Sequence, residues 1–329
     1  MIKSPKFWSK KNHFLSFCFL PLSLIYQASH VLIRKFTTEL SIKVPTICVG
    51  NLTMGGNGKT PVVNEIRRLL TDKSKFKKIF ILSRGYNASM QGPHLVLDND
   101  HAHKVGDEAL LHRENGPVCV SKNKKEGAKF CVKEGADLLI LDDGFQSKNI
   151  KKDISFIVID STLKFGNERI FPSGPLREGV KYGLSRADAI IYIKNNKKKL
   201  ELKLNKKVKI FNAIRKIEIK GKVNKNIYAF CGIGIPENFF KSLSDLGLNI
   251  ICKKTFPDHH KFLDHEIENI IKISKEKNLQ IITTSKDLVK INVKFKKEIL
   301  FAKLSIHFES EKEIINFIKK KILIKTSIY

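Results

Sequence analysis

Acidic residues are scarce in this 329-residue sequence. It has 32 Asp and Glu against 61 Lys and Arg, which leaves a formal net charge of +29. This balance favours an anionic partner such as nucleic acid, an acidic membrane surface or a phosphorylated substrate, although lysine is abundant along the whole chain and composition alone explains the charge equally well. Because neither an RNA-binding signature nor a helix-turn-helix pattern accompanies the charge, we do not expect nucleic acid to bind.

Closely spaced cysteines are also missing. The six cysteines include no pair with C-x-x-C spacing, and most lie in apolar runs. The sequence therefore predicts buried, reduced thiols in a cytosolic protein, with neither a disulfide framework nor a zinc site.

Long uncharged runs are rare, and one near the N-terminus stands out. Residues 14–33 carry no formal charge, and Lys10-Lys11 and Arg34-Lys35 flank them. The length suits a membrane span, but the polar side chains share one face of a helix: Ser16, Ser23, Gln27 and His30. This pattern favours a helix lying in the membrane interface, with a buried core helix as the alternative. A secretory signal is disfavoured because no small-x-small cleavage site follows the run.

Beyond the N-terminal run, short apolar segments alternate with helical patterns, which is typical of an α/β fold with a parallel sheet. Strands are expected at residues 44–49, 78–82, 118–121, 137–141 and 155–160. A lysine-rich interval at 194–208 indicates a domain edge, and further strands are expected at 227–231, 249–252, 280–283 and 299–302. We therefore predict three parts: a membrane-associated helix in 1–35, a nucleotide-binding domain in 36–212 and a smaller α/β domain in 213–329.

Glycine is concentrated directly after the first expected strand, in a phosphate-binding loop. The loop consists of Thr53, Met54, Gly55, Gly56, Asn57, Gly58, Lys59 and Thr60. Its glycines let backbone N–H groups approach phosphates, its lysine can reach the β- and γ-phosphates, and its last hydroxyl can bind Mg²⁺. A helical pattern follows with Pro61 in its first turn. The usual motif begins with Gly where this chain has Thr53.

Polar residues follow other expected strands, where ligands gather in such sheets. Leu138 to Leu141 followed by Asp142-Asp143 resembles a Walker B element, although an Asp-Asp-Gly turn is common for turn reasons alone. Asp107 lies just before an apolar run, and on this pattern alone capping of a helix is the better explanation for it. Arg177 and Glu178 follow a proline-rich segment, where the arginine could bind phosphate or form a surface ion pair.

The second expected domain carries two further polar motifs. His259 lies beside an aspartate in Phe256-Pro257-Asp258-His259-His260, and a histidine in this setting could transfer a proton or orient another group. The alternatives are a surface histidine and an incidental metal ligand. Residues 284–287, Thr-Ser-Lys-Asp, indicate a helix start with Ser285 as its cap.

Taken together, the motifs resemble one family, the tetraacyldisaccharide 4'-kinases of Gram-negative bacteria. The motifs occur in the family's order at residues 50–61, 83–86, 105–108, 142–146, 165–178, 232–240 and 256–260. The family's phosphate loop also opens with a residue other than glycine. Asn87 and Ala109 depart from residues that are common in the family but leave the polar groups intact.

The resemblance implies transfer of the γ-phosphate of ATP to the 4'-hydroxyl of a tetraacyldisaccharide 1-phosphate, giving lipid IVA. It implies ATP and Mg²⁺ as cofactors and a location on the cytoplasmic face of the inner membrane. The expected partners are the membrane-embedded lipid substrate and the anionic membrane surface, with no protein partner.

The resemblance also assigns roles to single residues. The catalytic set is Lys59, Asp107, Arg177 and His259. The nucleotide is bound by residues 53–60 and Gln146, with Tyr86 as a further contact. The metal-binding set is Thr60, Asp142, Asp143 and Glu178. Whether Asp107 or His259 accepts the hydroxyl proton is left open.

Two other interpretations of the residues stay open. A membrane-associated P-loop ATPase that drives assembly would need the loop, but neither the Asp-His-His motif nor the Pro-Leu-Arg-Glu motif. A nucleic-acid-stimulated ATPase would account for the charge.

Overall fold

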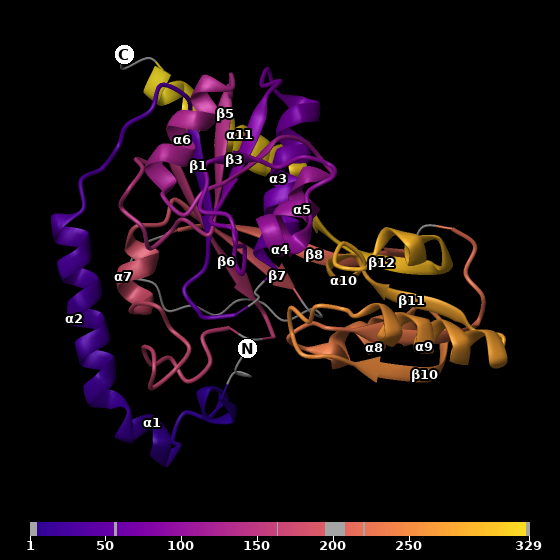
Figure 1. The fold of residues 1–329 in the computed structure, drawn as a ribbon. Coiled ribbons are helices and arrows are strands. Elements are labelled where there is room, and N and C mark those ends of the chain that lie inside the picture. Colours follow the sequence, from indigo (N-terminus) through magenta and orange to yellow (C-terminus); the bar gives the residue numbers. More distant parts are fainter. Residues whose placement is uncertain (1–4, 56–57, 163, 195–207, 220, 327–329) are drawn as a thin grey trace.

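The computed structural model describes residues 5–55, 58–162, 164–194, 208–219 and 221–326. Twelve strands of the described residues form one sheet in the order β10-β9-β11-β12-β8-β7-β6-β1-β5-β2-β4-β3 (Figure 1). The predicted α/β class with a parallel sheet is confirmed. The lysine-rich interval lies outside the described residues, apart from its two ends.

The first part of the sheet is parallel except at its edge. Its strands are β1 (Thr46–Gly50), β2 (Ile79–Ser83), β3 (His94–Leu95), β4 (Val118–Val120), β5 (Leu138–Asp142), β6 (Ile154–Asp160) and β7 (Ala189–Lys194). The strand β1 lies between β5 and β6, so the phosphate loop leaves the middle of this part. The sequence analysis did not predict β3 or β7.

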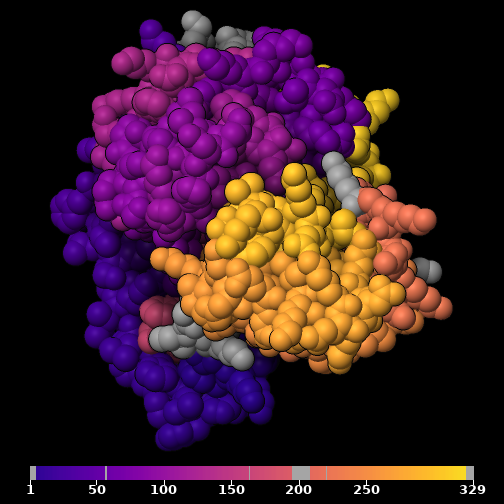
Figure 2. Space-filling view, turned by 45° about the vertical axis from the view of Figure 1, so that its right-hand side comes forward, coloured from indigo at the N-terminus to yellow at the C-terminus, as the bar shows by residue number. Residues whose placement is uncertain are grey.

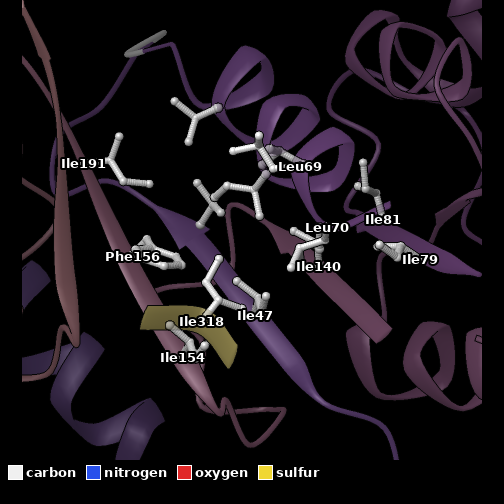
Figure 3. Packing of buried hydrophobic residues seen from close by; sticks show 14 of the residues in the cluster. Ile47, Leu69, Leu70, Ile79, Ile81, Ile140, Ile154, Phe156, Ile191 and Ile318 are labelled. Carbon is white, nitrogen blue, oxygen red and sulfur yellow. The ribbon is translucent and has the colours of Figure 1, made fainter. Parts of the chain in front are cut away.

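Helices cover both faces of this first part, as a parallel sheet requires. They are α3 (Lys59–Lys73), α4 (Ala102–Val105), α5 (Asp107–Arg113), α6 (Lys124–Lys133), α7 (Val180–Ser185) and the C-terminal α11 (Glu311–Thr326). Successive side chains of a strand point to opposite faces. Accordingly Ile47 packs in one cluster with Leu69 and Ile318 (Figure 3). Its neighbour Cys48 packs in a second cluster on the other face.

The second part continues the same sheet. Its strands are β9 (Asn226–Cys231), β10 (Asn249–Thr255), β11 (Gln280–Thr284) and β12 (Ile299–Phe308), and its helices are α8 (Pro236–Asp245), α9 (Asp264–Glu276), α10 (Ser285–Leu288) and the 3₁₀ helix η2 (Val293–Glu298). Two further clusters of buried apolar side chains form its core. The expected α/β character of this part is therefore confirmed.

The strand β8 (Lys209–Ile219) joins the two parts and was not predicted. Its first half pairs parallel with β7, and its second half pairs antiparallel with β12. Ala213 therefore faces both Ile193 at the end of β7 and Phe308 at the end of β12. The expected boundary between residues 212 and 213 lies inside this strand, and the division into domains stays a prediction.

This register makes the carboxyl ends of the two sets of strands face each other. Thr284, at the end of β11, pairs with Ala302 of β12, which in turn pairs with Ile219 of β8. The last residue of β7 pairs with Ile214 of β8. The ends of β11 and β7 are therefore separated by five residues along β8, a distance of roughly 17 Å. Loops from both parts project into this interval, and Figure 2 shows the two parts in contact.

The N-terminal segment forms a short 3₁₀ helix, η1 (Lys6–Ser9), and two α-helices, α1 (Phe14–Cys18) and α2 (Leu20–Phe36), that turn at Phe19. Proline at position 21 starts α2 and lacks the N–H that would continue α1. No helix in the described part of the chain combines the length and the apolar character that crossing a membrane requires. Of the predicted polar stripe, Ser16, Ser23 and His30 turn towards the protein, but Gln27 is exposed because the inward face runs through Tyr26 instead.

Candidate active site

The phosphate loop leads from β1 directly into α3. Gly55 and Gly58 have φ angles of 99° and 74°, which side-chain-bearing residues rarely adopt. A Cβ at Gly58 would also lie 3.0 Å from Ile193 Cδ1. Lys59 and Thr60 open α3, whose N-terminus favours bound phosphate. Residues 56 and 57 of the predicted loop, Gly56 and Asn57, lie outside the described residues.

The beginning of the loop is attached to the proline-rich segment that precedes Arg177. The N–H of Met54 donates to the carbonyl of Pro175 at 2.7 Å, and the N–H of Arg177 donates to the carbonyl of Leu52 at 2.7 Å. Thr53 forms an isolated antiparallel bridge to Leu176. These backbone contacts hold Arg177 beside the loop.

Asp143 connects the arginine to the loop lysine. Its carboxylate lies 2.8 Å from Arg177 Nη1 and 3.6 Å from Lys59 Nζ. Burial would raise the pKa of Asp143, but the charges of Lys59, Arg177 and Lys124 outweigh burial and lower it to about 2. This carboxylate is therefore ionised at neutral pH.

Asp142 is buried at the end of β5. One of its oxygens lies 3.1 Å from His112 Nε2, whose other ring nitrogen is 2.7 Å from Asn64 Oδ1. Its Oδ1 is buried without a hydrogen-bond partner among the described residues. A buried carboxylate oxygen without a hydrogen bond reduces stability unless a bound ligand interacts with it.

Among the residues expected to bind Mg²⁺, some have an oxygen available for the ion and others do not. In the part of the chain that the structure describes, no three His, Cys, Asp or Glu side chains gather into a preformed metal site. Mg²⁺ at a nucleotide site needs one or two carboxylates besides the phosphates, and the free oxygen of Asp142 with the hydroxyl of Thr60 suits it. Glu178 is engaged, because its two oxygens contact Gln146 Nε2 and Arg186 Nη2. All four metal-binding assignments stay predictions.

Asp107 and His259 meet across the interval between the two sets of strands. Asp107 is the first residue of α5, and its Oδ2 lies 2.8 Å from His259 Nδ1. Gly106, not Asp107, is the N-cap residue of this helix. Burial would raise the pKa of Asp107, but the hydrogen bond from His259 and the charge of Lys286 lower it below its ordinary value. The carboxylate is thus held ionised.

The surroundings of His259 come from both parts. Lys286 Nζ lies 3.1 Å from His259 Nε2, and Asp258 Oδ1 lies 3.8 Å from the same nitrogen. The ring of Tyr86 is 5.3 Å from the imidazole, centroid to centroid. His260 turns away, with Nε2 2.8 Å from Glu266 Oε2. Of the two adjacent histidines, therefore, His259 alone lies at Asp107.

Gln146 occupies the space between the loop and Glu178. Its Nε2 donates to the carbonyl of Asn51 at 2.8 Å, and its Oε1 lies 3.4 Å from Arg177 Nη1. The guanidinium of Arg34, from the end of α2, donates to the backbone carbonyl of Gln146 at 3.0 Å. The N-terminal helix is therefore connected to the site.

The comparisons with known proteins identify the family. The family model LpxK, described as tetraacyldisaccharide-1-P 4'-kinase, matches residues 15–323. The chain belongs to this family. A tetraacyldisaccharide 4'-kinase of Paramagnetospirillum magneticum is 36% identical over 317 residues, covering 94% of this chain and 95% of that one. One of Rickettsia peacockii is 35% identical over 289 residues, covering 88% and 89%.

A solved structure supports the same conclusion. The crystal structure titled as the "apo" form of LpxK from Aquifex aeolicus in complex with ATP is 26% identical. It matches with a TM-score of 0.78 and covers 94% of this chain and 99% of that one. The α/β P-loop fold and the kinase family are thus shown together.

Several residues of this family member's site were not foreseen from the sequence. Arg215 of β8 pairs with Asp160, and one of its terminal nitrogens would lie 3.4 Å from a Cβ at Gly58. His112 supports Asp142 from within α5. Nothing local in the sequence indicates either role, because both depend on which strands and helices become neighbours. The predicted cap of α10 was wrong: the hydroxyl of Thr284, not that of Ser285, accepts the N–H of Asp287 at 3.0 Å.

Proposed function

We propose that this chain transfers the γ-phosphate of ATP to the 4'-hydroxyl of a tetraacyldisaccharide 1-phosphate, forming lipid IVA at the cytoplasmic face of the bacterial inner membrane. The pair of Asp107 and His259 supports this proposal most directly. A simple ATP-driven switch has no need of a carboxylate and an imidazole 2.8 Å apart where the two parts of the sheet meet. A hydroxyl acceptor does need a proton acceptor within hydrogen-bond reach.

The proposed roles follow from the charges at the site. Lys59 neutralises the β- and γ-phosphates, and Arg177, 2.8 Å from Asp143, turns to the transferred phosphoryl group when nucleotide arrives. Bound Mg²⁺, held by Thr60 and Asp142, would neutralise phosphate charge. The ionised carboxylate of Asp107 accepts the hydroxyl proton as the new P–O bond forms. Since His259 belongs to the second part, the set is complete only when both parts are in contact, which limits transfer to water.

The outer face of α1 and α2 supports the location. Its large apolar side chains are exposed: Phe14, Leu22, Leu24, Ile25, Val31, Leu32, Ile33 and Phe36. The inner face is bonded to the protein, because Ser23 Oγ donates to the carbonyl of Ile170 at 2.8 Å and Asn167 Nδ2 donates to Ser16 Oγ at 3.1 Å. A helix apolar on one side and bonded on the other suits the surface of a bilayer, where the acyl chains of the substrate reside. The basic residues that flank it would strengthen attachment to anionic lipid.

The deciding experiment incubates the purified chain with labelled ATP and tetraacyldisaccharide 1-phosphate in mixed micelles and looks for a bis-phosphorylated lipid. Asp107→Asn and His259→Ala should each lower kcat by about a hundredfold or more, since they remove the proton acceptor or its partner. Asp245→Asn, at an exposed position of α8, is the control and should match the unmodified chain.

ATP turnover that proceeds equally with and without the lipid, as a P-loop switch would show, would contradict the proposed reaction. Nearly full lipid phosphorylation by both the Asp107 and the His259 variants at saturating substrate would instead contradict the roles proposed for these two residues.

A further inference from the structure

A bridge of polar side chains links α3 to the end of β5. His112, in α5, lies between Asn64 of α3 and Asp142 of β5. Its Nδ1 is 2.7 Å from Asn64 Oδ1, and its Nε2 is 3.1 Å from Asp142 Oδ2. His112 is fully buried, and Asp142 is nearly so. The proposed reaction assigns no function to Asn64, the residue from which this bridge starts.

The orientation of the Asn64 amide is fixed from two sides. Its Nδ2 donates to the carbonyl of Leu111 at 3.4 Å, and its Oδ1 accepts from Arg67 Nη2 at 3.4 Å. Arg67, itself buried, also donates to the carbonyl of His112. A guanidinium can only donate hydrogen bonds, so the amide atom that faces both Arg67 and the imidazole is the oxygen. The Nδ1 atom of His112 therefore donates to Asn64, which leaves its Nε2 for the carboxylate.

This bridge makes the two oxygens of Asp142 different. Oδ2 is engaged by the imidazole, whereas Oδ1 is buried without a hydrogen-bond partner among the described residues. Because the last torsion of an aspartate side chain is broad and two-fold, Asp142 without the bridge could turn either oxygen towards a neighbouring cation. Lys124 is such a neighbour, since its charge and that of Asp142 interact. The imidazole thus keeps one particular oxygen available for a ligand.

The bridge starts on the helix that supplies the other predicted metal ligand. Thr60 and Asn64 are four residues apart in α3 and so share one face of that helix. Asp107 is the first residue of α5, the helix that carries His112. One bridge therefore connects the three elements that carry Thr60, Asp107 and Asp142.

Packing alone does not require polar side chains at this place. The neighbours of Asn64 in α3, Val63 and Ile66, are buried in an apolar cluster against which Leu110 of α5 packs. Buried polar groups reduce stability unless they are hydrogen-bonded, and apolar residues of similar volume often stabilise a core as well or better. The polar bridge is explained by its end point, the carboxylate of Asp142.

We propose that Asn64, acting through His112, is a positioning residue for the metal site: it keeps Oδ2 of Asp142 engaged, so that Oδ1 is the oxygen available to the Mg²⁺ that accompanies the nucleotide. The proposal rests on the function proposed above and on its assignment of Asp142 to the metal. Mg²⁺ demands near-ideal octahedral geometry, so a carboxylate that is free to turn binds it less well. Loss of a hydrogen-bonding partner of a metal ligand typically lowers metal affinity by about 10- to 100-fold.

The test measures nucleotide affinity with and without metal in the full chain, and it needs no turnover. Calorimetry with the β,γ-methylene analogue of ATP gives one Kd in excess Mg²⁺ and another in EDTA. The ratio of the EDTA value to the Mg²⁺ value is the contribution of the metal. For Asn64→Leu we expect this ratio to fall by about tenfold, whereas the Kd in EDTA should change by less than about threefold.

Two variants of His112 separate the hydrogen bond from packing. His112→Leu keeps an apolar side chain in the space but removes both hydrogen bonds, so it should lower the ratio at least as much as Asn64→Leu. In His112→Gln the side-chain amide nitrogen can still donate to Asp142, and the ratio should stay within about threefold of the parent's. A purely structural role would not produce loss with leucine and rescue with glutamine in the metal-dependent Kd alone.

Asn238→Leu, at an exposed position of α8, makes the same chemical change as Asn64→Leu and is the matched control. It should keep the parent's ratio. The proposal is wrong if Asn64→Leu and His112→Leu also keep that ratio, or if they weaken binding equally in Mg²⁺ and in EDTA. If His112→Leu does not fold, His112→Gln and Asn64→Leu still decide, because the side chain of Asn64 is only half-buried.

Failure here is distinguishable from failure of the proposed function. Lipid phosphorylation by the parent, with an unchanged ratio in both leucine variants, would refute the bridge alone. The expected fall in the ratio without any lipid phosphorylation would refute the proposed reaction alone. A parent that binds the analogue equally tightly in Mg²⁺ and in EDTA would overturn the assignment of Asp142 to the metal, and this proposal with it.

Discussion

Asp100 shows how a single residue can stabilise the region next to the site without taking part in it. Its carboxylate lies 2.7 Å from His94 Nε2 and 2.6 Å from Lys104 Nζ, and it accepts the N–H of Leu97 at 2.9 Å. Burial would raise its pKa, but these three donors lower it to about 2. The segment that they fasten leads into α4 and from there to Asp107.

Asp100→Asn should therefore reduce the free energy of unfolding. The pKa of Asp100 is depressed on folding, so its contribution is fully present above its unfolded pKa of about 4 and is lost as pH falls towards about 2. The expected loss at neutral pH is about 2 kcal/mol. Urea denaturation at neutral pH and at successively lower pH values measures it, and the difference between variant and parent should shrink below about pH 4.

Asp98→Asn is the control, since this side chain is 84% exposed. It should change the free energy of unfolding by less than about 0.5 kcal/mol. A pH-independent difference between Asp100→Asn and the parent would show that the carboxylate's charge is not what stabilises the fold.

How far the site could be predicted also differs residue by residue. Lys59 and Thr60 were identifiable because a phosphate loop is a local pattern whose chemistry is contained in eight consecutive residues. Asp107 and His259 could be singled out by resemblance, but their contact depends on the register of β8 and β12. The partner of Asp142, His112, left no local signal, because any buried histidine in an amphipathic helix has the same pattern.

At the scale of elements, α2 has an exposed apolar face and an opposite face that packs against the protein. The exposed face includes Ile25, with 66% of its surface accessible, and Phe36, with 76%. The opposite face is fastened to the segment that carries Arg177 and Glu178. If the proposed location is right, the helix therefore presents its apolar face to the lipid while holding part of the site.

Ile25→Asp should weaken binding to anionic vesicles by about ten- to a hundredfold, because a buried isoleucine contributes about 1.5–3 kcal/mol and tenfold corresponds to about 1.4 kcal/mol. Vesicle co-sedimentation at fixed ionic strength measures this change. Val293→Asp adds the same charge at a site 77% exposed in η2 and should bind like the parent. Equal binding by all three proteins would exclude α2 as the membrane contact.

Elements were predictable where the pattern was local. The strands β1, β5, β6 and β9 are short, almost entirely buried and mostly apolar, and the sequence analysis predicted both ends of each to within two residues. The strand β8 was missed because charged residues such as Arg215 and Lys216 interrupt it. Because β8 is half-exposed and follows a lysine-rich interval, nothing in the sequence indicated that a strand connects the two parts.

At the scale of the whole molecule, β8 brings a residue from the connecting strand to the phosphate loop. Arg215 pairs with Asp160, and its guanidinium lies beside Gly58. Asp160 ends β6, whereas Asp142 ends β5, and these two strands flank β1 on different sides. Arg215 therefore lies on the side of the loop opposite to Asp142 and Asp143.

Replacing both members of this pair, Asp160→Asn with Arg215→Met, removes the arginine without leaving a buried charge unpaired. We expect the Kd values of ATP and of ADP to rise together by about tenfold or more, since a charged hydrogen bond contributes about 1.5–3 kcal/mol. Titration calorimetry with each nucleotide measures both. Lys209→Met, at the exposed start of β8, is the control. Unchanged ADP binding in the double variant would show that Arg215 does not contact the nucleotide.

The attachment of α1 and α2 to residues 167–173 has a kinetic consequence. In the proposed location, with their apolar face in a bilayer, these helices would hold the phosphate loop and Asp107 at a constant height above the lipid. The acceptor then reaches the enzyme by diffusing within the plane of the leaflet. Initial rates should accordingly follow the mole fraction of acceptor in the surface rather than its bulk molarity, so adding inert detergent at constant acceptor concentration should slow the reaction.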